Sequence, residues 1–92
     1  MLIKCLDNDK YLFYCPGCNC YHWFTVPKWT WNGNFEKPTV SPSIITSPHD
    51  PRIKCHLQII CGELKYFTDS RHYLSGISIS MVDLEEMEEK LK

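Results

Sequence analysis

The stretch Phe13-Tyr14-Cys15-Pro16-Gly17-Cys18 decides the fold of this chain. Two cysteines separated by a Pro-Gly pair form a tight turn in which both thiolates face one point, as a tetrahedral metal ion requires. Strand-like residues lead into this turn at 11–14 and away from it at 21–26. We therefore predict a zinc-ribbon-like hairpin that binds Zn²⁺ through Cys15 and Cys18 in a structural site.

A structural zinc ion takes four protein ligands, so two more donors must come from elsewhere in the chain. Potential donors gather further along, where Cys55 precedes His56 and where His72 follows a polar turn. We predict Cys55 and His72 as the remaining ligands, with His22 and His56 as alternatives. Asp69 would then accept a hydrogen bond from a ligating imidazole and fix its tautomer.

Composition narrows the class of protein. A chain of 92 residues suits one domain, 1–92, with a small core that a metal site would stabilise. Six cysteines with no signal-like N-terminal stretch favour metal ligands over disulfides. The net charge of −1, without a basic run, does not indicate binding to a nucleic-acid backbone. No apolar segment is long enough to span a bilayer.

The other elements are predicted to be short antiparallel strands. Alternating apolar runs bounded by turn residues lie at 2–6, 10–14, 21–26, 52–60, 63–67 and 77–81. In the fourth run Cys55 should face the core and His56 the opposite side. Residues 38–45 contain too much proline for a central strand. Asp83 is a candidate N-cap for a short acidic helix or tail at 83–92. The predicted fold is mainly β, a small antiparallel domain of hairpins with a short C-terminal helix.

A second group of polar and aromatic residues is a candidate ligand-binding surface. An indole, an Asn-Gly turn and a row of hydroxyls share a proline-stiffened segment, which lowers the entropy cost of presenting a fixed surface. The predicted members are Trp31, Asn32, Thr39, Ser41, Ser43, His56 and Asp69. Aromatic residues on short strands also fill cores, so a structural role is the alternative for Trp31.

Several short motifs in fixed order resemble a family of small proteins common in bacteriophages and prophages. The resemblance covers 11–84 and rests on Cys15-Pro16-Gly17-Cys18 with His22, Trp31-Asn32-Gly33, residues 38–43, Cys55-His56, Gly62, residues 69–72 and residues 74–76. The family has no assigned function, although some members carry an "ammonia monooxygenase" label that this chain, without a cluster of His ligands suited to copper, does not support. The family often has Cys where this chain has Ser70. The resemblance implies a phage-encoded protein of the host cytoplasm.

We predict from these observations a non-enzymatic, zinc-stabilised binding module that acts on a host protein or on a small, nucleotide-like ligand. One alternative is a zinc hydrolase with an open metal position. Another is a nucleic-acid-binding zinc ribbon, in which aromatic residues stack on bases. Exposed edge strands would support a homodimer, and no membrane partner is expected.

Overall fold

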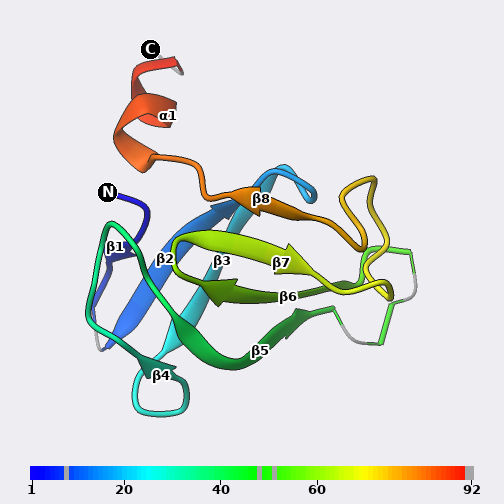
Figure 1. The fold of residues 1–92 in the computed structure, drawn as a ribbon, viewed down its shortest axis with the longest axis horizontal. Coiled ribbons are helices and arrows are strands. Elements are labelled where there is room, and N and C mark those ends of the chain that lie inside the picture. The colour runs from blue at the N-terminus through cyan, green and yellow to red at the C-terminus, as the bar shows by residue number, and fades with distance from the viewer. Residues whose placement is uncertain (8, 48, 51, 91–92) are drawn as a thin grey trace.

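Two antiparallel sheets and one short helix make up the computed structural model, which describes residues 1–7, 9–47, 49–50 and 52–90 (Figure 1). The first sheet has the order β1-β2-β3, formed by Lys4–Cys5, Lys10–Cys15 and Cys20–Thr25. The second has the order β4-β5-β6-β7-β8, formed by Thr30–Trp31, Val40–Thr46, Cys55–Ile60, Glu63–Tyr66 and Ser78–Ser80. The helix α1 is Leu84–Lys90. The predicted mainly β fold class is confirmed.

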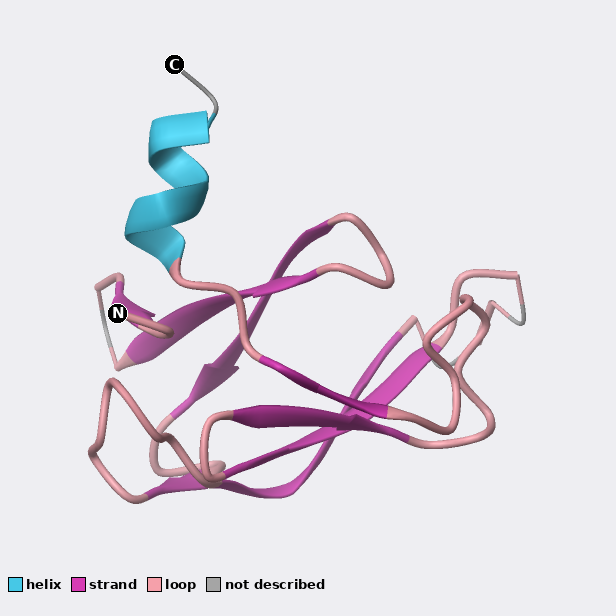
Figure 2. Cartoon of the chain, turned by 45° about the horizontal axis from the view of Figure 1, so that its top comes forward, coloured by secondary structure: helices cyan, strands magenta, loops and turns pink. Residues whose placement is uncertain are grey.

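The hydrophobic core lies between the two sheets, whose strands cross one another in both views (Figures 1 and 2). Phe13 and Phe24 come from the three-stranded sheet, and Leu57, Ile59 and Leu64 come from the other. All five side chains are fully buried. Burying a side chain of this size stabilises a fold by about 1.5–3 kcal/mol, so the packing of sheet on sheet holds the domain together.

The proline-rich segment departs from the predicted strand pattern. We expected 38–45 not to form a central strand, yet β5 lies between β4 and β6. The register between β5 and β6 shifts between Val40 and Ile44, so that Pro42 falls inside an irregularity of the ladder. A proline at a bulge removes no ladder hydrogen bond, which is why the strand tolerates it.

The β6–β7 hairpin has the alternation that its sequence predicts. Cys55, Leu57 and Ile59 are fully buried, whereas His56 is only partly buried on the opposite face. The two-residue turn at Cys61 and Gly62 has positive φ at both positions (48° and 78°), as a type I′ hairpin turn requires. The first arm is shorter than the predicted 52–60, because β6 begins at Cys55.

The helix α1 begins where the sequence predicts. The Asp83 carboxylate accepts hydrogen bonds from the amides of Glu85 (2.9 Å) and Glu86 (3.2 Å), which satisfies two of the free N–H groups of the first turn. Residues 91–92 of the predicted tail lie outside the described residues. Within the described residues, no helix is both long and apolar enough to cross a membrane.

Candidate functional site

Four side chains from three strands and one turn converge on a single point. Cys15 ends β2, Cys18 lies in the turn after it, His22 is on β3 and Cys55 begins β6. Their ligand atoms all lie within 4.8 Å of one another. The Cys15 and Cys55 sulfurs are 3.9 Å apart, and four ligands at zinc–sulfur distance around a tetrahedron would be roughly 3.8 Å apart. The four residues are therefore arranged to hold a metal ion.

The surroundings of the His22 imidazole test independently whether the four residues are placed to bind a metal ion. The residue is 7% exposed, and its Nε2 atom is buried without a hydrogen-bond partner among the described residues. A buried imidazole nitrogen left without a partner is costly, and most such groups in proteins are satisfied. A metal ion at the centre of the group would use this lone pair.

The three thiols of the cluster shift one another's pKa values because they lie close together. A hydrogen bond from the Cys55 thiol lowers the pKa of Cys15 to about 3. The same contact raises the pKa of Cys55, and burial raises that of Cys18 to about 12. A divalent cation would stabilise all three as thiolates and displace their protons.

His72, predicted as a ligand, lies next to this group rather than within it. Its Nδ1 atom accepts a hydrogen bond from the Leu74 amide (3.2 Å), so a neutral imidazole carries its proton on Nε2. That Nε2 atom is 3.4 Å from the Cys55 sulfur, to which it donates. The ring packs tightly over Gly17, where an added Cβ would lie 2.3 Å from it. In this structure His72 donates a hydrogen bond to Cys55, one of the four potential metal ligands. A role for His72 as a metal ligand itself stays a prediction.

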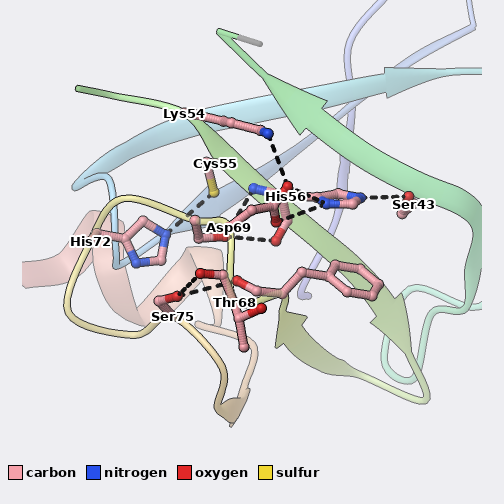
Figure 3. A network of polar contacts seen from close by, with 10 residues as sticks. Ser43, Lys54, Cys55, His56, Thr68, Asp69, His72 and Ser75 are labelled. Carbon is pink, nitrogen blue, oxygen red and sulfur yellow. Dashed lines mark hydrogen bonds and ion pairs between the residues drawn. The ribbon is translucent and has the colours of Figure 1, made fainter. Parts of the chain in front are cut away.

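A second set of side chains lies on the opposite face of β6 and forms a continuous hydrogen-bond chain (Figure 3). The Ser43 hydroxyl is 2.9 Å from Nε2 of His56. On the other side of the ring, Nδ1 of His56 is 3.0 Å from one carboxylate oxygen of Asp69 and 3.3 Å from the other. Serine, histidine and aspartate linked in this order form the arrangement that activates a serine nucleophile.

The direction of these hydrogen bonds follows from the chemistry of the three groups. The ionised Asp69 carboxylate only accepts, so Nδ1 of His56 must carry the imidazole proton and donate it. Nε2 of the neutral ring is then an acceptor and takes the hydrogen bond of the Ser43 hydroxyl. This is the tautomer in which a histidine can remove a proton from serine.

Surrounding groups fix the orientation of His56. Its backbone amide donates to the Ser70 hydroxyl (3.0 Å), and its carbonyl accepts from the same hydroxyl (2.8 Å) and from the Phe67 amide (2.9 Å). The imidazole stacks on the Phe67 ring at 4.2 Å between centroids. Ser70 thus positions β6 through its hydroxyl.

Lys54 keeps the Asp69 carboxylate of this hydrogen-bond chain ionised. Its ammonium group is 2.9 Å from Asp69. This contact, more than the hydrogen bond from His56, lowers the pKa of the Asp69 carboxyl below its usual value. Because Asp69 is 44% exposed, solvent screens the pair. The carboxylate is nevertheless charged throughout the neutral range and available to orient the imidazole.

The other predicted surface residues hold turns in place. Asn32 accepts hydrogen bonds from the amides of Asn34 and Thr39 (both 3.1 Å), and Thr39 accepts one from the Cys61 amide (2.9 Å). The Trp31 ring packs against aromatic neighbours such as Phe35, at 4.9 Å between centroids. Ser43, His56 and Asp69 are brought together, whereas Trp31, Asn32, Thr39 and Ser41 do not join their hydrogen-bond chain. A binding role for these four stays a prediction.

The sequence contains all three members of the chain but no motif that joins them. A serine within Ser41-Pro42-Ser43 is not a known nucleophile motif such as G-x-S-x-G. Only the pairing of β5 with β6, which places Ile45 opposite His56, brings Ser43 to the imidazole. The signal in the sequence was therefore limited to residue types.

Fold and site together define a small two-sheet β domain with a Cys₃His metal-binding arrangement on one face of β6 and a Ser-His-Asp arrangement on the other. The family model described as "Bacterial ubiquitination-like system serine protease (BubE)" matches residues 2–67, more than two thirds of the chain, and this protein belongs to that family. The match includes Ser43 and His56 and ends two residues before Asp69. No curated protein and no solved structure matches the chain.

Proposed function

We propose that this protein is a serine protease of a bacterial ubiquitination-like system, with Ser43 as the nucleophile, His56 as the general base and Asp69 as the residue that orients the base. The observation that carries the proposal is the hydrogen-bond chain Ser43–His56–Asp69, with contacts of 2.9 and 3.0 Å. The description of the family supports the same reaction and the same system.

The reaction follows from the tautomer described above. The Ser43 oxygen attacks the carbonyl carbon of the scissile amide while its proton passes to Nε2 of His56. Asp69 stabilises the imidazolium that forms, through the hydrogen bond to Nδ1. The imidazolium then protonates the leaving amine, and the acyl group remains on Ser43. Water, deprotonated by His56, releases the acyl group as a carboxylic acid and regenerates the serine.

The metal site has a structural role in this proposal. Cys15, Cys18, His22 and Cys55 would hold zinc, for which three thiolates and one imidazole form a closed tetrahedral set. Such a set leaves no position for water or substrate, so the ion contributes folding free energy rather than chemistry. This arrangement disfavours the zinc-hydrolase alternative. The Ser43–His56 contact in turn favours an enzyme over the non-enzymatic binding module that the sequence first suggested.

Free thiols agree with a reducing compartment. All six cysteines are free, and three of them lie in the metal-binding group. We propose the cytoplasm as the site of action for this reason. Phage origin and a homodimer stay predictions from the sequence.

A fluorophosphonate reagent tests the proposal directly, because it phosphonylates only an activated serine. Metal-loaded protein should be labelled at Ser43, as located by peptide mass spectrometry. Ser43→Ala and His56→Ala should not be labelled, whereas Ser80→Ala, which removes an exposed hydroxyl on β8, should be labelled like the parent protein. Folded, metal-loaded protein that neither reacts at Ser43 nor cleaves any internally quenched peptide would refute the assignment.

A further inference from the structure

A groove runs along β5 next to Ser43 and also reaches the metal-binding group, because its lining includes Ile44 and Ile45 as well as Cys18 and His22. Its volume is about 910 Å³. One wall comprises Trp23, Thr25 and Trp29, and the other comprises Ile44, Ile45 and Thr46. Ile44 directly follows Ser43, and Ile45 is the ladder partner of His56. Ser43 and His56 do not line the groove themselves but adjoin two residues that do.

On the side of β5 that faces away from β6, the described residues offer no strand partner beyond Ser41, although the Trp29 indole Nε1 donates to the Ser43 carbonyl (3.4 Å). β4 pairs with β5 only at Val40 and Ser41. Further along, His56 directs its amide and carbonyl away from β5, to Ser70 and Phe67. Its partner Ile45 is thus at a non-hydrogen-bonded position of the antiparallel ladder, so the Ile45 amide and carbonyl point away from β6. An exposed N–H and C=O on a strand edge are a template for another strand.

Three apolar side chains that line the groove are exposed. Trp23 is 53% exposed, Ile45 43% and Ile53 58%, and all three line the groove. Neighbouring exposed apolar residues beside a strand edge mark a surface that a partner covers. Side chains of a bound peptide would supply that cover.

The charges around the groove all have one sign. Lys28, Arg52, Lys54 and Arg71 line it, and among the residues that the structure describes no aspartate or glutamate does. Two of these cations already have partners, because Arg52 pairs with Asp50 (3.2 Å) and Lys54 with Asp69 (2.9 Å). Among the described residues, the exposed Arg71 side chain has no ion pair. It is available to a carboxylate that arrives with a ligand.

We propose that the groove binds an extended, acidic segment of the polypeptide substrate as an added strand on the open edge of β5. The inference rests on the proposed protease function and names the chemistry of its substrate. The backbone of one substrate residue exchanges two hydrogen bonds with Ile45, apolar side chains cover Trp23 and Ile53, and a carboxylate pairs with Arg71. Ser43 is two residues from Ile45, roughly 7 Å along an extended strand. The scissile carbonyl is therefore about two residues from the residue that pairs with Ile45.

The acidic preference is tested with pools of internally quenched octapeptides in which one position is fixed as Asp, Asn or Lys. The parent protein should cleave the best Asp pool about tenfold faster than the Lys pool at the same position, the effect of one charge contact in the transition state. Arg71→Glu should remove or reverse that ratio. Lys65→Glu, the same charge change on an exposed residue of β7, should keep it. Equal ratios in all three proteins would overturn the acidic assignment.

The strand-addition geometry is tested separately with the peptide backbone. In the best peptide, N-methylation at the amide that pairs with Ile45, within about two residues of the cleaved bond, should abolish cleavage, while N-methylation at the neighbouring amides should not. Ile45→Pro removes the one N–H that the strand offers to substrate and none that it offers to β6. This variant should lose peptide cleavage yet keep fluorophosphonate labelling of Ser43.

The readouts separate the two proposals. If Ser43 is labelled and peptide cleavage is unaffected by N-methylation and by Ile45→Pro, the groove assignment is refuted and the proposed protease function stands. Loss of both labelling and cleavage in the parent protein would refute the protease and the groove together. If Ile45→Pro fails to fold, as judged by melting temperature and metal content, Arg71→Glu still tests whether the groove binds the substrate.

Discussion

Replacing Asp69 with asparagine tests whether this carboxylate sets the tautomer of His56 that the proposed mechanism requires. The carboxylate accepts from Lys54 on one side and from Nδ1 of His56 on the other. An amide in its place has only one acceptor oxygen, and the ammonium group of Lys54 will attract that oxygen. The amide NH₂ then faces Nδ1, which must become an acceptor. The imidazole proton moves to Nε2, where it blocks proton transfer from Ser43.

The size of the effect follows from the exposure of Asp69. Changing the aspartate of a fully buried triad to asparagine reduces kcat by about 10⁴-fold. Asp69 is 44% exposed, so water screens its charge and assists the imidazole. We therefore expect Asp69→Asn to lower kcat for peptide hydrolysis by roughly 100- to 1,000-fold, with KM nearly unchanged because the carboxylate does not line the groove.

A double variant separates this explanation from a simple loss of charge. Lys54→Met in the Asp69→Asn background removes the cation that captures the amide oxygen, so the oxygen can turn to Nδ1 and restore the productive tautomer. Steady-state hydrolysis of an internally quenched peptide should then recover by about tenfold relative to the single variant. Metal content and melting temperature serve as controls for folding. A single variant within about threefold of the parent, or a double variant slower than the single, would refute the reasoning.

Further predictions concern the metal site, pH and packing. Purified protein should contain one zinc ion per chain by elemental analysis, and Cys15→Ser should lose both metal and folded structure, as followed by circular dichroism; a variant with the parent melting curve would contradict a structural site. The lowered pKa of Asp69 means that its ionised form stabilises the fold above its unfolded pKa of about 3.9 and that this contribution is lost as pH falls through the lower folded value. Urea titrations of the parent and Lys54→Met between neutral and acidic pH should differ least at the lowest pH, and a constant difference would argue against the pair. Gly17→Ala should destabilise the domain by about 1–3 kcal/mol, because the added methyl would lie 2.3 Å from the His72 ring; an unchanged melting temperature would show that the ring can move aside at no cost.

Local chemistry predicted much of the metal site. The Cys-Pro-Gly-Cys turn is formed by consecutive residues, so Cys15 and Cys18 could be recognised without knowledge of the fold. Alternation along β6 also separated Cys55 from His56 correctly. The choice between His22 and His72 depends on which imidazole lies inside the core, and both lie within reach of Cys55.

The Ser43–His56–Asp69 arrangement could not be predicted because it depends on pairing between distant strands. Ser43 meets His56 only through the β5–β6 ladder, and the sequence argued against that ladder by its proline content. Pro42 suggested a break, whereas the register shift places it where no ladder bond is lost. Strand propensity describes single segments, so an irregular central strand of this kind gives a misleading local signal.

Cys55 and His56 are consecutive residues on opposite faces of β6. Because of this adjacency, metal binding through Cys55 would require the same register of β6 that places His56 beside Ser43. A slip of one residue in the pairing of β6 would turn Cys55 outward and His56 inward, and it would dismantle both sites at once. A chain that binds a metal ion through Cys55 would therefore also present the His56 imidazole to Ser43. An incompletely folded chain lacks both features. With the proposed function, a newly synthesised molecule would not cleave other proteins before it binds its metal ion.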